Sequence, residues 1–388
     1  MSRSRRDGAL ATTSDMIDRD EFSAWLRLLD TPGVGRASAR ALLARFGGAE
    51  AVIGASLDAR RAVVGPVVAA ALERLPEHFD ARLDSAWRWL TGGGDEPRDI
   101  VVVGDPRYPQ ILLESADPPL LLYARGRVEL LQSPAIAIVG SRNPTPQGLE
   151  NARAFASHLS RAGWVVVSGL ALGIDGAAHE GGLEGGSGTI AVVGTGLDRI
   201  YPARHRALTA RIAANGLVIS EFATGTPALA EHFPIRNRII AGLGRGTLVV
   251  EAALQSGSLI TARLAAESGR DVFAIPGSIH SPQARGCHAL IKQGAKLVDS
   301  AADIVDELAP IASVSATADV RDTASAPAAQ ARKDAVLDAL GFDPIGLDAL
   351  IARTGRSAAE LSARLLDLEL QGRVARLAGQ LFQRVERA

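Results

Sequence analysis

The sequence contains a single cysteine, Cys287, among its 388 residues, so no disulfide can form within the chain and no cysteine-rich zinc site exists. Aromatic residues make up only 4% of the chain, and alanine, valine, leucine and isoleucine must therefore build most of the core. The chain also lacks an apolar run of the ~20 residues that a transmembrane helix needs. These absences predict a cytoplasmic protein that is not inserted in a membrane.

Neither sign of charge dominates, because 42 lysines and arginines face 43 aspartates and glutamates and the formal net charge is −1. This balance excludes a protein coated in positive charge, such as a histone-like DNA binder, although a local basic patch can still bind nucleic acid. Residues 1–19 are rich in arginine and serine but lack the apolar core of a secretory signal, which predicts a disordered tail.

The rest of the chain divides into three folded regions and a linker. Residues 20–95 have helical hydrophobic spacing, interrupted by the turn sequence Thr31-Pro32-Gly33-Val34-Gly35. Residues 96–308 alternate short apolar runs with helical segments, which predicts an α/β domain with a Rossmann-like, doubly wound, mostly parallel sheet. Residues 309–331 have the composition of a flexible linker. Residues 332–388 show three helical segments and two strands, the pattern of a winged helix.

Glycine and hydroxyl residues gather where the predicted strands end. The strands are expected at 136–139, 164–167, 189–193, 217–220, 247–250, 271–275 and 296–298. Gly140-Ser141-Arg142 follows the first strand, Ser168-Gly169 closes the second, and Ser256-Gly257-Ser258 opens a helix after the fifth. Ligands of an open parallel sheet bind outside these carboxyl ends, where glycine, a helix N-terminus and an arginine fork suit phosphate. We therefore predict an anion-binding rim.

The run Arg236-Asn237-Arg238 stands at the front of an apolar helix before the fifth strand. Salt bridges at a helix start would explain either arginine alone. Beside a phosphate-binding rim, the run favours a ligand with several phosphates, such as a nucleic-acid backbone. Neither G-x-G-x-x-G after the first strand nor a Walker A sequence is present, which argues against a dinucleotide or ATP.

Four further side chains could be catalytic, but the sequence favours structural roles for them. Asp175 and His179 are four residues apart and lack a clear third metal ligand, so we expect them to form a hydrogen-bonded pair that orders their loop. Glu221 and Glu251 both end strands and could form a carboxylate pair, but fixing loop amides and arginines is the favoured role. We predict no catalytic residue, no metal site and no enzymatic activity.

These motifs together resemble the DNA-processing protein A family (DprA, also called Smf) over about residues 20–308. The matching stretches are 137–142, 168–175 with His179, 194–198 with Tyr201-Pro202, 233–242, 256–262, Pro276-Gly277 and 290–295. The resemblance implies binding and protection of single-stranded DNA, loading of the RecA recombinase during natural transformation, a homodimer formed through the Rossmann-like domain, and no cofactor. The predicted DNA-binding residues are Gly140, Ser141, Arg142, Ser168, Gly169, Arg236, Asn237, Arg238, Ser256, Gly257, Ser258 and Lys292.

Two histidines depart from the family pattern, which usually has asparagine where His205 and His288 stand. The second lies near the expected rim, where the departure puts that contact in question; histidine can still donate to phosphate.

The flanking regions resemble nucleic-acid-binding modules. The turn at 31–35 resembles a helix-hairpin-helix (SAM-like) motif, for which DNA binding and a purely structural role are both open. The third helix of the winged helix, Ala359–Gly372, carries Glu360, Asp367 and Glu369 against Arg364. That balance suits an interaction or regulatory role at least as well as entry into a groove.

The main alternative is a nucleotide-cleaving enzyme that resembles the LOG-type phosphoribohydrolases, which share a related sheet and carry P-G-G-x-G-T-x-x-E. The corresponding run here is 243–251, which lacks Pro-Gly-Gly and displaces the glutamate, Glu251, by one residue. For the DNA-binding hypothesis, we expect Arg142→Ala and Arg238→Ala each to weaken binding of single strands and to flatten its salt dependence.

Overall fold

The structure is a computed structural model that describes residues 17–94, 96–308, 334–342 and 344–385. The predicted linker at 309–331 and nearly all of the predicted tail at 1–19 lie outside these residues. The chain divides into two compact units, one of residues 1–93 with 98–102 and one of residues 94–97 with 103–388. No described helix is both long enough and apolar enough to cross a membrane.

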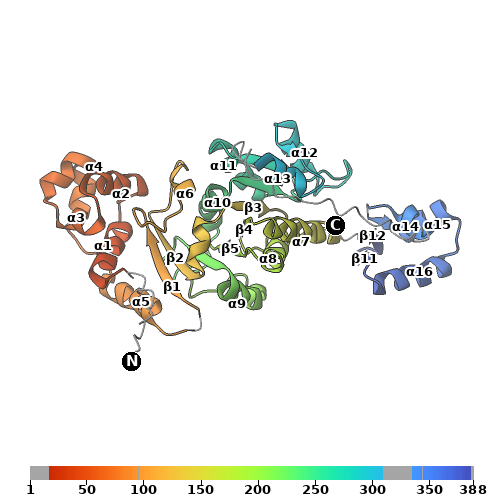
Figure 1. Ribbon diagram of the computed structural model, residues 1–388, viewed down its shortest axis with the longest axis horizontal. Coiled ribbons are helices and arrows are strands. Elements are labelled where there is room, and N and C mark those ends of the chain that lie inside the picture. Colours follow the sequence, from red (N-terminus) through yellow and green to blue (C-terminus); the bar gives the residue numbers. More distant parts are fainter. Residues whose placement is uncertain (1–16, 95, 309–333, 343, 386–388) are drawn as a thin grey trace, which may run out of the picture. The chain divides into compact units, whose positions relative to one another are not determined.

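The first unit is helical, as predicted (Figure 1). Its elements are α1 (Arg19–Asp30), α2 (Arg36–Phe46), α3 (Ala49–Gly54), α4 (Leu57–Ala71), α5 (Phe79–Thr91) and β1 (Arg98–Val102). The carboxylate of Asp18 caps α1 by accepting the backbone amides of Asp20 and Glu21. Gly33, with φ of +87°, makes the tight turn between α1 and α2 that the sequence predicts.

The second unit contains a long, mostly parallel sheet. Its strands are β2 (Leu121–Gly126), β3 (Ala135–Val139), β4 (Val165–Ser168), β5 (Thr189–Val192), β6 (Leu217–Ser220), β7 (Gly246–Val249), β8 (Asp271–Ala274) and β9 (Lys296–Leu297). They lie in the order β2-β6-β5-β4-β3-β7-β8-β9, and every pair is parallel except β2 with β6. The seven predicted strands match β3 to β9 to within one residue at each end, which confirms the mostly parallel Rossmann-like sheet.

The strand order reverses between β3 and β7. The chain moves outward from β3 through β4 and β5 to β6, and it then returns to place β7 on the other side of β3. The loops that leave β3 and β7 therefore diverge and open a crevice at their carboxyl ends. A crevice of this kind is the usual ligand site of an open parallel sheet.

Helices connect the strands and cover the sheet. They are α6 (Gln110–Leu113), η1 (Val128–Gln132), α7 (Pro146–Arg161), α8 (Ile174–Gly185), η2 (Ala203–His205), α9 (Arg206–Asn215), α10 (His232–Leu243), α11 (Ser258–Glu267), α12 (Arg285–Lys292) and α13 (Ala302–Leu308). Side chains of α7, α8 and α13 share one core cluster with β3, β4, β7 and β8. Helices α10 and α11 pack against each other and against β3 and β7, respectively.

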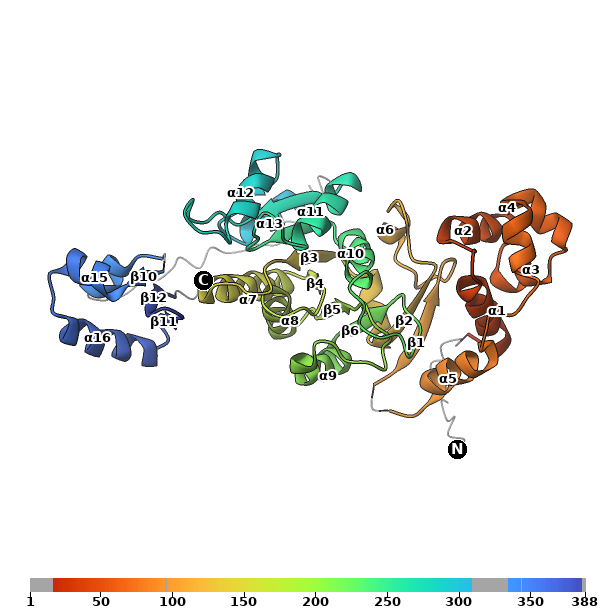
Figure 2. The ribbon, with the colours of Figure 1, turned by 180° about the vertical axis from the view of Figure 1, so that it is seen from behind.

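Helices α7 and α8 lie side by side in both views (Figures 1 and 2) and pack closely. Glycine makes this approach possible, because a Cβ on Gly181 would meet the carbonyl oxygen of Arg153 and lie 2.8 Å from the Cβ of Ala156. A Cβ on Gly185 would lie 2.6 Å from the carbonyl oxygen of Ser157. Since α8 follows the β4 loop directly, this packing fixes the loop on one side.

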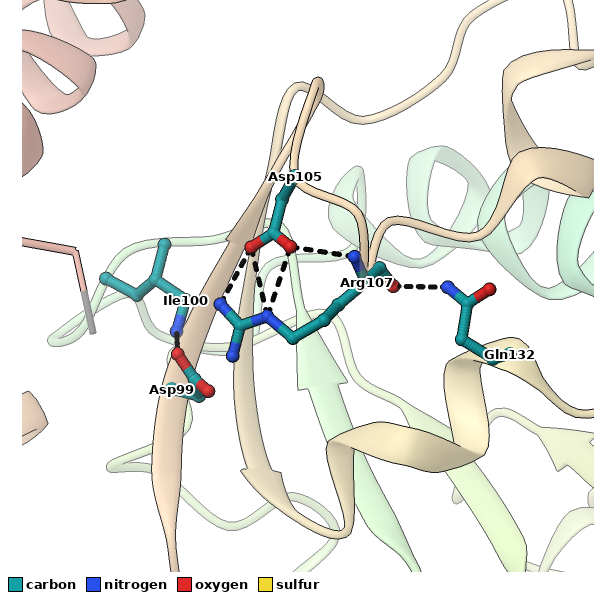
Figure 3. A network of polar contacts seen from close by, with 5 residues as sticks. All are labelled: Asp99, Ile100, Asp105, Arg107 and Gln132. Carbon is teal, nitrogen blue, oxygen red and sulfur yellow. Dashed lines mark hydrogen bonds and ion pairs between the residues drawn. The ribbon is translucent and has the colours of Figure 1, made fainter. Parts of the chain in front are cut away.

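Polar contacts order the segment that follows β1 (Figure 3). The carboxylate of Asp105 accepts the backbone amide of Arg107 at 2.7 Å and also binds its guanidinium group. The side-chain amide of Gln132, in η1, donates to the carbonyl oxygen of Arg107 at 2.7 Å. Within β1 itself, the carboxylate of Asp99 accepts the backbone amide of Ile100 at 2.7 Å. The turn at 105–107 is thereby tied to η1, just ahead of β3.

The C-terminal region is a winged helix, as predicted. Its elements are α14 (Ala335–Leu340), β10 (Ile345–Gly346), α15 (Leu347–Thr354), α16 (Ala358–Leu370), β11 (Val374–Leu377) and β12 (Leu381–Arg384). The three strands form an antiparallel sheet in the order β10-β12-β11. Its core is apolar and includes Leu350, Leu361 and Leu368, each 0% exposed.

Candidate nucleic-acid interface

A cleft of about 830 Å³ lies at the crevice between β3 and β7. It is lined by residues of the loops that follow β3, β4, β5, β6, β7 and β8 and by the first residues of α10 and α11. A backbone hydrogen bond joins the β3 and β7 loops, because the amide of Ser141 donates to the carbonyl oxygen of Glu251 at 2.7 Å. The cleft therefore occupies the position that the strand topology dictates.

The first two residues of the β3 turn set its shape. A Cβ on Gly140 would lie 2.7 Å from Cγ1 of Ile174 and 2.9 Å from the carbonyl oxygen of Glu251, so only glycine fits. Ser141 is buried, its Oγ accepts the amide of Asn143 at 3.1 Å, and its carbonyl oxygen accepts the amide of Ile174. Both residues line the cleft as predicted, but the Ser141 hydroxyl is engaged in holding the turn.

Arg142 is the cation that this turn presents to solvent. Its guanidinium carbon lies 5.5 Å from the centre of the Phe233 ring. Within the described part of the chain, no carboxylate lies at ion-pair distance from Arg142. Its charge is therefore available to an anion in the cleft.

Two aromatic side chains beside Arg142 were not among the predicted site residues. The rings of Tyr201 and Phe233 lie 5.6 Å apart at the edge of the cleft, and Tyr201 is 48% exposed. The chain has only 16 aromatic residues, nine Phe, four Trp and three Tyr. Tyr201 lies in the loop after β5 and Phe233 is the second residue of α10, so two of these few residues stand close to glycine-rich strand ends, which was a usable signal.

Arg236 is buried below the cleft, with 4% of its surface exposed. Its guanidinium group donates to the carbonyl oxygen of Gly169 at 2.6 Å and to that of Val192. Burial lowers the pKa of Arg236 to about 10, so that it stays charged at neutral pH. Arg236 therefore lines the cleft while it ties the β4 loop to the end of β5.

Asp175 and His179 order the β4 loop as predicted, but each binds backbone amides of the loop instead of the other side chain. The carboxylate of Asp175 accepts the amides of Gly169 and Ala171, each at 3.2 Å. Nε2 of His179 accepts the backbone amide of Leu170 at 3.3 Å, so the ring proton is on Nδ1. Nδ1 in turn donates to the hydroxyl of Thr189 at 2.7 Å. Leu170 has a left-handed backbone, with φ of +57°, which few residues other than glycine adopt without support.

Burial shifts the pKa of both groups that hold this loop. It raises the pKa of Asp175 above its usual value, while the charges of Arg236 and Arg142 and two backbone amides act in the opposite direction. It lowers the pKa of His179 to about 3, helped by His205 and Arg236, so His179 is neutral. His205 also supports the loop, because its Nδ1 lies 3.0 Å from the carbonyl oxygen of Leu170. This contact gives the first of the two departing histidines a structural role.

Arg238 takes the salt-bridged alternative that the sequence left open. It is 12% exposed, its Nε donates to Asp117 at 3.1 Å, and its Nη2 donates to Glu221 at 2.5 Å. It does not line the cleft. Its neighbour Asn237 does line the cleft, with its side-chain amide 3.4 Å from the carbonyl oxygen of Gly257.

Glu251 is also engaged structurally. Its carboxylate accepts the Oγ1 hydroxyl of Thr145 at 2.6 Å and the backbone amide of Thr145 at 2.9 Å, just before α7 begins. Burial raises the pKa of Glu251, and the Thr145 hydrogen bonds oppose this effect. Glu221 and Glu251 therefore do not form a carboxylate pair, and each fixes a loop or an arginine as favoured.

Of the other predicted contact residues, three line the cleft, whereas Ser168 and Lys292 do not. Ser256, Gly257 and Ser258 line the cleft at the N-terminus of α11, and the hydroxyls of the two serines lie 2.7 Å apart. Ser168 is 0% exposed and donates to the carbonyl oxygen of Ile138, inside the sheet. Lys292 is exposed at the end of α12 and does not line the cleft.

Two residues remain to be placed: Gly169, a predicted contact, and His288, which departs from the family pattern. Gly169 lines a smaller cavity of about 90 Å³, which Arg142, Tyr201 and Phe233 also line. His288 binds backbone instead of facing the cleft, with Nε2 2.9 Å from the carbonyl oxygen of Gly277. Among the described residues, no group of three or more histidine, cysteine, aspartate and glutamate side chains could hold a metal ion.

Comparison with known proteins agrees with this architecture. The family model for DNA recombination-mediator protein A matches residues 99–309, and the model for the DprA winged helix domain matches residues 320–380. DNA processing protein DprA of Streptococcus pneumoniae is 50% identical over 203 residues, which are 52% of this chain and 72% of that protein. Protein Smf of Escherichia coli K12 is 40% identical over 317 residues, 79% of this chain and 82% of that protein.

A solved structure extends the similarity to the fold. The X-ray structure of DNA processing protein A from Streptococcus pneumoniae aligns with a TM-score of 0.65 at 39% identity, and it covers 75% of this chain and 98% of that one. The chain therefore belongs to the DNA recombination-mediator protein A family, whose members are called DprA or Smf.

Proposed function

We propose that this protein binds single-stranded DNA in the cleft between β3 and β7. The observation that carries the proposal is the grouping of Arg142, Tyr201 and Phe233 at the cleft edge, next to the N-terminus of α11. The unpaired guanidinium group and the helix N-terminus suit phosphates, and the two rings offer surfaces on which bases stack. Bases in a duplex are stacked on each other, so a single strand uses both features more fully.

The names of the relatives support a role in DNA processing. The resemblance to the DprA family leads us to propose a more specific role. The protein protects incoming single strands and loads RecA onto them during natural transformation. It acts in the cytoplasm, as a homodimer and without a cofactor. Strand exchange by purified RecA on DNA bound by this protein tests the loading role, which requires a faster reaction with the protein than without it. Sedimentation at micromolar concentration tests the dimer.

The test of DNA binding is titration of a labelled 20-nucleotide oligothymidylate and of a duplex of equal length at several salt concentrations. We expect tighter binding of the single strand and a logarithmic salt slope of about −0.7 for each phosphate neutralised. Arg142→Ala should flatten this slope by about 0.7 because one phosphate contact is lost. Phe233→Ala should instead weaken binding by about 1–3 kcal/mol at every salt concentration, since stacking involves no counterion. Equal slopes for the Arg142→Ala and wild-type proteins would refute the site.

Arg238→Ala provides the matched comparison, because it also removes one arginine of the predicted set. Its two carboxylate partners already neutralise Arg238, so we now expect the salt slope to stay within experimental error of the wild type. A slope flattened as much as in Arg142→Ala would restore Arg238 as a DNA contact.

The enzymatic alternative is tested separately. In a phosphoribohydrolase the glutamate after β7 would have to face the nucleotide, but Glu251 binds Thr145. We expect no release of base from nucleoside monophosphates, as followed by chromatography. Release that disappears in Glu251→Gln would overturn the assignment as a non-enzymatic protein.

A further inference from the structure

The outer face of α16 in the winged helix carries an apolar stripe that the domain core does not use. The core contacts of this helix come from Leu361, Leu365 and Leu368, which are all buried. Leu366 and Leu370 point the other way and are 57% and 81% exposed. With 3.6 residues per turn, they align with the exposed Ala359 and Ala363. These four residues are called the α16 stripe below.

Carboxylates border the α16 stripe on both sides. At 100° per residue, Glu360 and Asp367 lie along one side of the stripe and Glu369 lies along the other. The single arginine of the helix, Arg364, lies on the far side from Leu366 and forms ion pairs with Asp334 and Asp367. The nearest other basic residues lie outside the helix: Arg356 stands two residues before it and acts on the charge of Glu360, and Arg373 follows in the turn to β11. The face that a winged helix would insert into a DNA groove is therefore apolar with acidic borders.

Three kinds of molecule could cover the α16 stripe: DNA, a second copy of this protein, or a basic segment of another protein. The charges beside the stripe decide between them. Phosphates of DNA would approach carboxylates and find no cation on the stripe. A second copy would bring acidic borders against acidic borders, at a cost in repulsion. A partner with lysines or arginines beside its apolar side chains satisfies both the stripe and its borders, as when amphipathic helices bind in apolar grooves.

We propose that the α16 stripe is the docking surface for a basic amphipathic segment of another protein. Leu366 and Leu370 are its apolar anchors, and Glu360 and Glu369 select positive charge beside them. The winged helix then serves as a protein-recruiting module. This inference does not depend on DNA binding by the cleft, because it rests on a different domain and on other residues.

The experiment uses the full chain and two fluorescein-labelled 16-residue peptides. Both carry leucines at helical i, i+4, i+7 and i+11 positions, and the positions beside them are lysine in one peptide and glutamate in the other. Anisotropy should show saturable binding of the lysine peptide and none of the glutamate peptide. Leu366→Ser combined with Leu370→Ser should weaken binding at least tenfold. Glu360→Gln combined with Glu369→Gln should also weaken it and reduce its salt dependence.

Controls keep the result interpretable. Val67→Ser removes an equally exposed apolar residue, 79% exposed, from the first unit and should leave peptide binding unchanged. The thermal midpoint of the double serine variant should equal that of the wild type, because both leucines lie outside the core. Equal binding of the lysine peptide to the wild type and the double variant, or no binding at all, overturns the proposal. Loss of self-association in the double variant would instead assign the stripe to a second copy, and loss of duplex DNA binding would assign it to nucleic acid.

Discussion

Replacement of Arg236 by methionine tests whether this arginine holds the cleft floor together. The side chain is buried and donates to the carbonyl oxygens of Gly169 and Val192. Methionine fills much of the same volume but leaves both carbonyl groups without these donors, and it removes the positive charge near Asp175. An unsatisfied buried acceptor costs about 1–3 kcal/mol, so we expect the free energy of unfolding of the second unit to fall by about 3–5 kcal/mol.

The loss should depend on pH through Asp175, whose pKa is raised in the folded protein mainly by burial. At pH values between the pKa of Asp175 in the unfolded state and its higher pKa in the folded state, the folded state binds more protons. The free energy of unfolding therefore falls as the pH rises through this range. Arg236 lowers the pKa of Asp175, and its removal therefore raises this pKa further and extends the window upward. The Arg236→Met variant should lose more stability at pH 7 than at pH 4. Addition of Asp175→Asn should recover part of the loss at pH 7.

Hydrogen exchange of peptides from residues 165–180 gives a local readout of this loss. A decrease of about 3–5 kcal/mol in opening free energy speeds exchange by at least 100-fold, since each 1.4 kcal/mol is a factor of ten. Arg142→Met is the matched control, because Arg142 is exposed and its substitution should change stability by no more than about 0.5 kcal/mol. Protection of Arg236→Met within tenfold of the wild type at pH 7 would refute the structural role of Arg236.

Two further perturbations follow from the buried residues around the same loop. Burial lowers the pKa of His179 to about 3, so below pH 6.5 the unfolded state binds more protons than the folded state. The free energy of unfolding should therefore fall on acidification by on the order of 1 kcal/mol per pH unit. Urea denaturation of His179→Gln should show a flatter dependence on pH, and identical pH profiles for the variant and the wild type would contradict the pKa shift. Gly181→Ala places a Cβ against the carbonyl oxygen of Arg153 and should destabilise the second unit by about 1–3 kcal/mol in thermal melts, whereas Gly54→Ala, whose Cβ would meet nothing within 4 Å, should not.

The sheet was predictable because its signal is local. Each buried parallel strand is a short apolar run bounded by glycine or polar residues, as in 189–193 and 247–250, and this pattern needs no knowledge of distant contacts. The cleft followed from the same pattern, because the carboxyl ends of parallel strands gather at one edge. Gly140, Arg142 and Ser256 were found in this way.

The direction of individual side chains was less predictable, because it depends on residues far away in the sequence. Arg236 and Arg238 are two positions apart on a helix, so they point to different faces; one binds loop carbonyls and the other binds Asp117, which is 121 residues distant. Ser168 is the last residue of β4, and its buried hydroxyl donates to the carbonyl oxygen of Ile138 in the neighbouring strand β3. The aromatic pair Tyr201 and Phe233 comes together only because the β5 loop meets the first turn of α10, 32 residues further along the chain.

The left-handed Leu170 and the buried groups that hold it bear on how a ligand is captured. The conformational entropy of the β4 loop is already lost when the domain folds, so a ligand that enters the cleft has little protein left to order. Most of the ordering cost then falls on the ligand itself, and a flexible polymer would be held in a shape that the protein had adopted beforehand. Variants that loosen this loop should therefore reveal themselves as faster dissociation, with association left nearly unchanged.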